Sequence, residues 1–285
     1  MVTGISGCPL TGWPGRRRVR HDDPVRVLIL GGTGEARRLA TVLADDPASG
    51  LAGGSGGGLS VVSSLAGRVR EPVLPPGEVR VGGFGGAAGL RDYLRAERIT
   101  AVIDATHPFA ATMSASAAAT TAELGIPLLV LRRPGWTPGE GAGDGERWHR
   151  VPTLAAAAEA LPGLGRRVFL STGRGGLAAF AGLDGHWFLV RSVDPPELPT
   201  PRRMHSVLAR GPFSLAGERA LLREHRIDVL VTKDSGGEQT AAKLVAAGEL
   251  GIPVLIQSRP PVPPGVPVRE TVDGAVRWLA ELPRY

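Results

Sequence analysis

Apolar, β-branched runs alternate with helix-spaced segments along most of this chain. The first run, Val25 to Leu30, stops at the glycine-rich Gly31-Gly-Thr-Gly-Glu35, and apolar residues then recur with helical spacing as far as Leu43. An apolar strand that ends in clustered glycines and continues as a helix is typical of βα units in parallel sheets. The sequence therefore predicts an α/β fold whose sheets are mostly parallel and doubly wound.

The same alternation continues to the end of the chain. Further strands are expected at Leu59 to Ser63, Glu78 to Gly82, Thr100 to Ala105, Pro127 to Leu131, Arg167 to Ser171, His186 to Arg191, His205 to Arg210, Asp228 to Thr232 and Pro253 to Gln257. Helices are expected at Ala87 to Arg98, Pro108 to Leu124, Pro152 to Leu161, Gly176 to Phe180, Leu215 to His225, Gln239 to Ala247 and Val272 to Leu282.

An internal repeat suggests two related domains. Leu124-Gly-Ile-Pro-Leu-Leu-Val130 recurs as Leu250-Gly-Ile-Pro-Val-Leu-Ile256, and upstream Leu94-Arg-Ala-Glu-Arg-Ile99 recurs as Leu222-Arg-Glu-His-Arg-Ile227. A glycine that ends a helix before a strand is common in α/β proteins, so part of the match is generic. The paired order still indicates two Rossmann-like domains.

Between the repeats lies a segment with the composition of a linker. Residues 133–147 contain Pro134, Pro138 and five glycines, which disfavour a packed element. The predicted organisation is a disordered leader at 1–23, an N-terminal α/β domain at 24–132, a linker at 133–147 and a C-terminal α/β domain at 148–285.

Composition narrows the function classes. The formal charge of +6 is carried almost wholly by scattered arginines, with Lys233 and Lys243 the only lysines, so we do not expect a nucleic-acid partner. A single cysteine, Cys8, excludes a disulfide framework and a cysteine-based metal site. No run of eighteen apolar residues is present, and a soluble, cytoplasmic protein is expected.

The glycine turn at Gly31 is a candidate dinucleotide site. Gly32 and Gly34 match the first two positions of G-x-G-x-x-G, but Arg37 stands at the third. Glu35 would compete with a phosphate for the positive end of the helix. A ligand-free βα turn is the alternative interpretation of this motif taken alone.

The end of the second strand bears on the choice of cofactor. An NAD enzyme usually places a carboxylate there, whereas this chain has Ser63, Ser64 and, a few residues on, Arg68. Hydroxyls and a guanidinium suit a 2′-phosphate, which favours NADPH over NADH. An ordinary turn with an exposed arginine is the alternative.

Three loops follow apolar strands with hydroxyls, charge and either glycine or a proline that opens a helix. They are Asp104-Ala-Thr-His-Pro-Phe-Ala110, Ser171-Thr-Gly-Arg-Gly-Gly176 and Thr232-Lys-Asp-Ser-Gly-Gly237. Each can present donors to an anion, although helix capping alone also accounts for their hydroxyls. His107 is a candidate proton donor or acceptor near neutral pH, and a histidine that caps the helix at Pro108 is the alternative. No histidine has metal-ligand spacing, so no metal is expected.

Taken together, these motifs resemble the precorrin-6A reductase family of cobalamin biosynthesis over about residues 25 to 282. The motifs that carry the resemblance are Gly31-Gly-Thr-Gly-Glu35, Ser63-Ser-Leu-Ala-Gly-Arg68, Gly82-Gly-Phe-Gly-Gly86, Ala105-Thr-His-Pro-Phe-Ala110, Ser171-Thr-Gly-Arg174 and Thr232-Lys-Asp-Ser-Gly-Gly237. The resemblance implies two α/β domains with a cofactor cleft between them, and NADPH-dependent reduction of a tetrapyrrole double bond that converts precorrin-6A to precorrin-6B.

The resemblance also implies roles for residues. Cofactor contacts are expected from Gly31, Gly32, Thr33, Gly34, Glu35, Ser63, Ser64, Arg68, Gly83 and Phe84. Catalytic roles are expected for Thr106, His107 and Lys233, and substrate contacts for Arg174, Arg191, Lys233 and Ser235. Asp234 departs from the asparagine usual in the family, and its carboxylate would be less welcoming to an anion.

Two alternatives stay open. One is the cobalt-containing substrate of the anaerobic branch, because side chains that grip the periphery of a macrocycle do not read its metal centre. The other is a non-catalytic NADPH-binding sensor with the same fold. The sequence does not determine the oligomeric state, the proton source or the stereochemistry of hydride transfer.

Overall fold

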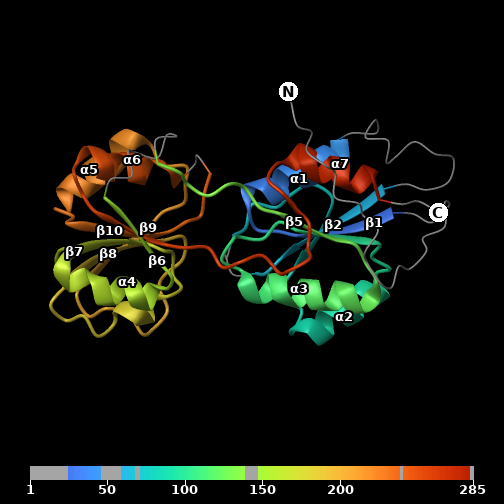
Figure 1. The fold of residues 1–285 in the computed structure, drawn as a ribbon, viewed down its shortest axis with the longest axis horizontal. Helices are drawn as coiled ribbons and strands as arrows, with labels where there is room; N and C mark the ends of the chain where they lie inside the picture. Colours follow the sequence, from blue (N-terminus) through green and yellow to red (C-terminus); the bar gives the residue numbers. More distant parts are fainter. Residues whose placement is uncertain (1–24, 46–58, 68–70, 139–146, 238–239, 283–285) are drawn as a thin grey trace, which may run out of the picture. The chain divides into compact units, whose positions relative to one another are not determined.

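The protein folds as two compact α/β units. The computed structural model describes residues 25–45, 59–67, 71–138, 147–237 and 240–282. Unit 1 comprises residues 1–68, 72–132 and 262–285, and unit 2 comprises residues 69–71 and 133–261. In each unit a central sheet lies between two layers of helices (Figure 1). The predicted leader at 1–23 lies outside the described residues.

Unit 1 is built on a six-stranded sheet in which every neighbouring pair is parallel. The spatial order is β12-β5-β4-β1-β2-β3, which is the 3-2-1-4-5-6 order of dinucleotide-binding sheets with β12 as the sixth strand. Its strands are β1 (Val25–Leu30), β2 (Leu59–Leu65), β3 (Glu78–Val81), β4 (Ala101–Asp104), β5 (Leu128–Leu131) and β12 (Val268–Arg269). Its helices are α1 (Gly34–Asp45), α2 (Ala87–Ala96), α3 (Ala111–Leu124) and α7 (Val272–Ala280).

Alternate residues of the central strand β1 pack on opposite faces of this sheet. Ile29 packs in one core with Leu39 of α1 and Trp278 of α7. Leu28 packs in the opposite core with Leu90 of α2 and with residues of α3. Burial on both faces explains why β1 is a continuous apolar run from Val27 to Leu30, without a polar alternation.

Unit 2 repeats this architecture. Its six-stranded parallel sheet has the order β6-β11-β10-β7-β8-β9, which is again 3-2-1-4-5-6 when β7 is counted as the first strand and β6 as the sixth. Its strands are β6 (Trp148–Val151), β7 (Arg167–Ser171), β8 (Trp187–Ser192), β9 (Met204–Leu208), β10 (Val229–Lys233) and β11 (Val254–Gln257). Its helices are α4 (Leu154–Ala160), α5 (Leu215–Glu224) and α6 (Ala242–Glu249), with short 3₁₀ turns η1 (Leu161–Gly163) and η2 (Leu177–Phe180).

The internal repeat of the sequence corresponds to matching positions in the two sheets. The repeated Gly-Ile-Pro precedes β5 and β11, each the fifth strand of its unit. Gly125 and Gly251 both have left-handed backbones, with φ of 67° and 66°. Arg98 and Arg226 hold the same position in the upstream repeat and are the positive-φ non-glycine residues of the described chain. The predicted α/β fold of two Rossmann-like units is confirmed.

The domain boundaries need two corrections. The closing segment, expected in the C-terminal domain, belongs to unit 1, because α7 buries Val272 and Trp278 in the core of β1 and β12 pairs with β5. The first part of the expected linker is packed, because Trp136 is only 5% exposed in the core of unit 2. The remainder of that segment, residues 139–146, is outside the described residues.

The sixth strand of each sheet was not predicted. β6 has the sequence Trp-His-Arg-Val and β12 is only Val-Arg, so neither carries an apolar run or a long alternation. Both are recognisable only by pairing with a neighbouring strand.

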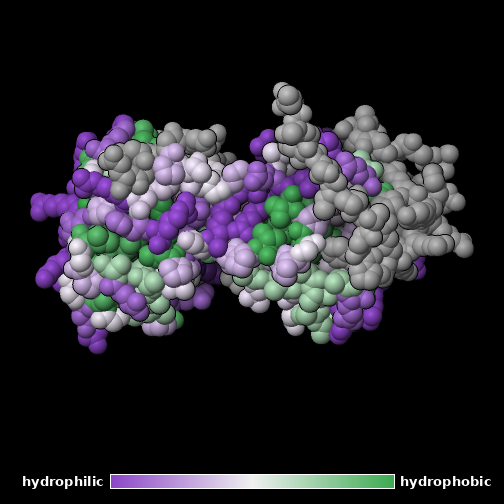
Figure 2. All heavy atoms as spheres, in the orientation of Figure 1, coloured by the Kyte–Doolittle hydropathy of each residue, from purple (hydrophilic) through white to green (hydrophobic). Residues whose placement is uncertain are grey.

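In each unit, hydrophobic surface appears at the level of the sheet, between the helix layers (Figure 2). None of the described helices is both long and apolar enough to cross a membrane.

Candidate functional site

The strand order locates one candidate site at the carboxyl ends of β1 and β4. The order reverses between these two strands, and open α/β sheets bind ligands in the crevice that forms at such a reversal. The glycine turn at Gly31 follows β1, and the loop that begins at Ala105 follows β4. Two of the loops nominated from the sequence therefore lie side by side in unit 1.

The glycine turn leaves backbone open for a ligand. Gly31 donates its N–H to the carbonyl of Ser64 at 2.9 Å, which fixes the turn against β2. Gly32 has φ of 112°, and a Cβ atom there would meet no atom within 4 Å. Gly34 opens α1, so the turn presents the positive end of that helix.

Thr33 has a structural role in this turn. Its Oγ1 accepts the N–H of Ala36 at 3.1 Å, as an N-cap, and donates to the carbonyl of Ala105 at 2.8 Å. The hydroxyl is buried and both of its contacts are intramolecular. We therefore assign the side chain of Thr33 a structural role, in which it joins the loops that follow β1 and β4, in place of the predicted contact with a cofactor. Glu35 lies in the first turn of α1 and is half-buried.

Ser63 and Ser64, near the end of β2, lie beside Arg80, which was not predicted from the sequence to be a site residue. Ser63 is 2% exposed and its Oγ has no hydrogen-bond partner among the described residues, whereas Ser64 Oγ accepts a hydrogen bond from Arg80 at 3.4 Å. Arg80 lies beside Ser64 through the register of β2 and β3, a pairing that the separation in sequence does not reveal. Arg68, the predicted 2′-phosphate partner, lies outside the described residues.

Arg80 also organises the next glycine-rich loop. Its guanidinium donates to the carbonyls of Gly82 and Gly83 and lies over the ring of Phe84, 4.0 Å from the centroid. A Cβ atom on Gly83 would meet nothing within 4 Å, but one on Gly89 would lie 1.7 Å from the carbonyl oxygen of Phe84. Arg80 thus fixes the loop through its carbonyls, and the backbone at Gly83 is open for a ligand.

The loop after β4 is ordered by Asp104. This buried carboxylate accepts hydrogen bonds from the backbone N–H of Thr106 at 3.0 Å and from its hydroxyl at 2.6 Å. His107 is exposed, and its Nδ1 accepts the N–H of Phe109 at 3.3 Å, which places the proton of the neutral ring on Nε2. Helix α3 begins at Ala111 and not at Pro108, because residues 107–110 close a turn first.

Unit 2 has an equivalent reversal between β7 and β10. The loops that follow these strands are the other two nominated from the sequence. They contain Thr172, Arg174 and Ser235, and Lys233 is the last residue of β10. Arg174 pairs with the exposed Glu197 at 3.3 Å. The geometry thus gathers the nominated residues of unit 2 at one end of its sheet, with one exception.

That exception is Arg191. It is the penultimate residue of β8, is 9% exposed and pairs with the buried Glu218 at 2.8 Å. Its guanidinium also lies 3.7 Å from the centroid of Phe213. Because its charge is already neutralised inside the core, we withdraw Arg191 from the set of substrate contacts.

Asp234 has a structural role, whereas the sequence suggested a carboxylate that would disfavour an anionic ligand. Its oxygens accept from the N–H of Trp136 at 3.0 Å and from Arg150 at 3.0 Å, and Arg259 lies nearby at 3.8 Å. Arg133 donates to the carbonyl of Ser235 at 2.7 Å. Asp234 therefore fastens residues 133–136 to the loop after β10, with its charge compensated by arginines.

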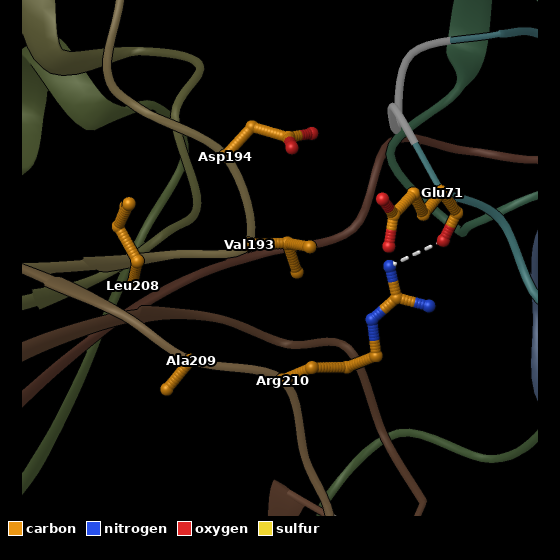
Figure 3. Close-up of a pocket in the computed structure, with 6 residues that line it drawn as sticks. All are labelled: Glu71, Val193, Asp194, Leu208, Ala209 and Arg210. Atoms are coloured by element: carbon orange, nitrogen blue, oxygen red, sulfur yellow. Dashed lines mark hydrogen bonds between the residues drawn. The ribbon is translucent and has the colours of Figure 1, made fainter.

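A shallow hollow of about 340 Å³ lies at the carboxyl ends of β8 and β9. It is lined by Glu71, Val193, Asp194, Leu208, Ala209 and Arg210. Arg210 reaches the carbonyl oxygen of Glu71 at 2.9 Å (Figure 3). Among the described residues, no group of three or more His, Cys, Asp or Glu side chains is placed to hold a metal ion.

The strand order of both sheets and the glycine-rich turn after β1 define a two-unit protein of the Rossmann class. Within that class the chain belongs to the precorrin-6x reductase family, since the family model described as precorrin-6x reductase CbiJ/CobK matches residues 26–280.

Relatives and a solved structure agree with this membership. The chain is 56% identical to a precorrin-6A reductase of Rhodococcus erythropolis, over 91% of this chain and 99% of that protein. It is 51% identical to one of Mycobacterium tuberculosis, over 90% of this chain and 98% of that protein. A solved structure of CobK precorrin-6A reductase matches with a TM-score of 0.79 and 46% identity, covering 90% of this chain and 96% of that one. A cobalt-precorrin-6A reductase of Priestia megaterium is 27% identical, over 90% of this chain and 99% of that protein.

Proposed function

We propose that this protein reduces a double bond of precorrin-6A with NADPH to give precorrin-6B, in cobalamin biosynthesis. The observation that carries the proposal is the glycine turn at the strand-order reversal of unit 1, in a chain of the precorrin-6x reductase family. We further propose a cytoplasmic location, which fits a chain of 285 residues with one cysteine.

The features that support a dinucleotide site in unit 1 lie at the carboxyl ends of β1, β2 and β3. At Gly32, Gly83 and Gly85 a Cβ atom would meet nothing within 4 Å, so the backbone is open to close approach by phosphates. Ser63 adds a buried hydroxyl, without a partner in the part of the chain that the structure describes, near the end of β2, where a ribose is expected. When bound, NADPH supplies the hydride for the reduction. Gly31, Gly34, Ser64, Arg68 and Phe84 complete the proposed cofactor set.

The loops after β4 and β10 serve the tetrapyrrole in this proposal. His107 offers an Nε2 proton to the carbon that must be protonated after hydride transfer, and Thr106 fixes the loop through Asp104. Lys233, Arg174 and Ser235 provide charge and hydrogen bonds for the peripheral carboxylates of the macrocycle.

The metal-free substrate is favoured over the cobalt-containing one. The relatives called precorrin-6A reductase, among them that of Rhodococcus erythropolis, are far more similar to this chain than the cobalt-precorrin-6A reductase of Priestia megaterium. Side-by-side turnover of both substrates tests this choice. Faster turnover of the cobalt form would contradict it.

The activity itself is tested with purified protein, precorrin-6A and NADPH. We expect loss of absorbance at about 340 nm that depends on the tetrapyrrole, and a product that has gained two hydrogen atoms by mass spectrometry. NADH should be a poorer reductant. Tight NADPH binding with no tetrapyrrole-dependent oxidation would instead identify a non-catalytic sensor.

A further inference from the structure

Three polar side chains form a row across neighbouring strands of unit 2, at the carboxyl end of the sheet. Lys233, the last residue of β10, is paired in register with Gln257, the last residue of β11. On the other side, Thr232 is paired with Ser171, so Thr172 lies next to Lys233 where β7 ends. Thr172, Lys233 and Gln257 therefore occupy adjacent positions, with the lysine in the middle.

Lys233 and Gln257 lie on the same face of the sheet, because they are paired in register and successive residues of a strand point to opposite faces. Each shares that face with the residue two positions before it, Val231 or Leu255, in the core that packs against α4 and η2. Thr172 directly follows the last residue of β7, two positions after Leu170 of the same core. The row therefore caps that core at the end of the sheet where the strand order reverses.

The two outer members of the row have buried oxygen atoms without a partner. Thr172 is 6% exposed, and its Oγ1 makes no hydrogen bond within the described residues. Gln257 Oε1 is likewise buried and without a partner there. Leaving buried polar atoms unsatisfied costs free energy, so two of them beside one lysine call for a specific explanation.

The other unpartnered atoms among the described residues of unit 2 have a different setting. Ser206 lies within the edge strand β9, and His186 precedes β8 at the opposite end of the sheet. Glu218 is a carboxylate of α5 that already pairs with Arg191. The row places such atoms beside a lysine at the strand-order reversal of unit 2, where parallel sheets bind ligands.

We infer that Thr172, Lys233 and Gln257 form a subsite for one carboxylate side chain of the tetrapyrrole. Lys233 supplies the positive charge, the Thr172 hydroxyl donates to one oxygen, and the Gln257 amide donates after a half-turn that exchanges its oxygen and nitrogen. The neighbouring Asp234 does not oppose this, because Arg150 and the N–H of Trp136 already bind its carboxylate. The inference rests on the proposed function and adds Thr172 and Gln257 to it.

The test measures binding of precorrin-6A in the absence of nicotinamide cofactor, by quenching of tryptophan fluorescence. We expect Thr172→Val and Gln257→Leu each to raise the Kd for precorrin-6A about tenfold, as loss of a hydrogen bond to a charged group should. Thr172→Ser keeps the hydroxyl and should keep the affinity. Ser206→Ala is the matched control, since it removes an equally unpartnered hydroxyl away from the row. The Kd for NADPH should stay within about twofold in every variant.

The possible outcomes separate this subsite from the proposed function. Unchanged precorrin-6A affinity in both Thr172→Val and Gln257→Leu, with thermal melting like that of the wild type, overturns the subsite alone. A loss of NADPH affinity in place of tetrapyrrole affinity also overturns it. A wild-type protein that binds no precorrin-6A overturns the proposed function and the subsite with it. If Thr172→Val does not fold, Thr172→Ser and Gln257→Leu still decide the question.

Discussion

Two buried cations of unit 2 differ in how their charge is compensated. Arg191 is paired with Glu218 at 2.8 Å, whereas Lys243 donates to the carbonyl of Thr240 at 2.7 Å and lies 4.6 Å from the ring centroid of Trp136. Burial, together with the nearby Arg191 and against the opposing effect of Glu218, lowers the pKa of Lys243 to about 7. Lys243 is therefore the buried group whose titration should be visible in the stability of the protein.

The unfolding free energy should rise with pH because of Lys243. Between about pH 7 and the pKa of an unfolded lysine near 10.4, the unfolded chain holds a proton that the folded chain has lost, which contributes a slope of up to about 1.4 kcal/mol per pH unit. Lys243→Met should abolish that slope and raise the unfolding free energy at pH 7 by about 1–3 kcal/mol. Urea titrations at pH 7 and pH 9 measure both effects. Lys243→Arg, which keeps its charge at both pH values, should be destabilised, and an unchanged slope in Lys243→Met would contradict the assignment.

His107 is predicted to donate the proton. His107→Ala should lower kcat about 100-fold and leave the KM for the tetrapyrrole unchanged, because general-acid catalysis acts on the transition state. The exposed His149 gives a matched control, since His149→Ala should retain full kcat. Full turnover by His107→Ala, measured as NADPH oxidation, would remove His107 from the mechanism.

Arg80 and Arg68 should differ in their effects on cofactor choice. Both terminal nitrogens of Arg80 are bound to carbonyls of the glycine-rich loop, so Arg80→Leu should weaken NADPH and NADH to a similar extent, by about tenfold. Arg68→Gln should weaken NADPH alone, as loss of a 2′-phosphate contact would. Isothermal titration with both cofactors distinguishes the two. A selective loss of NADPH in Arg80→Leu would assign the 2′-phosphate to Arg80.

At the scale of elements, helix α2 packs closely against the preceding loop because Gly89 has no side chain. In Gly89→Ala the new methyl would lie 1.7 Å from the carbonyl oxygen of Phe84, so the loop and the helix must separate. We expect a loss of about 2–4 kcal/mol and weaker NADPH binding. Gly182→Ala is the control, because a Cβ atom there meets nothing within 4 Å and φ is not positive. Thermal melting of both variants measures the difference, and equal melting temperatures would contradict it.

At the scale of the whole molecule, the last segment of the chain completes the first unit. Removing residues 262–285 takes away β12 and α7, and with them Val272 and Trp278 from the core of unit 1. We expect the truncated protein to lose NADPH binding and the amide protection of β1, while β10 in unit 2 stays protected against hydrogen exchange. Hydrogen exchange read by mass spectrometry shows both. Retained protection of β1 would mean that the closing helix is dispensable.

The sequence by itself determined most of the elements, the pairing of two similar units, the family and the loops that follow β1, β4, β7 and β10. These features are local, because a buried parallel strand is an apolar run and the glycines that end it stand next to it in the chain. Only the tertiary structure decided that α7 belongs to unit 1, that β6 and β12 are strands, and that Arg191 forms a buried ion pair with Glu218. It also brought Arg80 beside Ser64, and Thr172 and Gln257 beside Lys233. Those facts depend on which strands are neighbours in a sheet and on which face a residue lies, and hydrogen bonding between segments distant in sequence sets both.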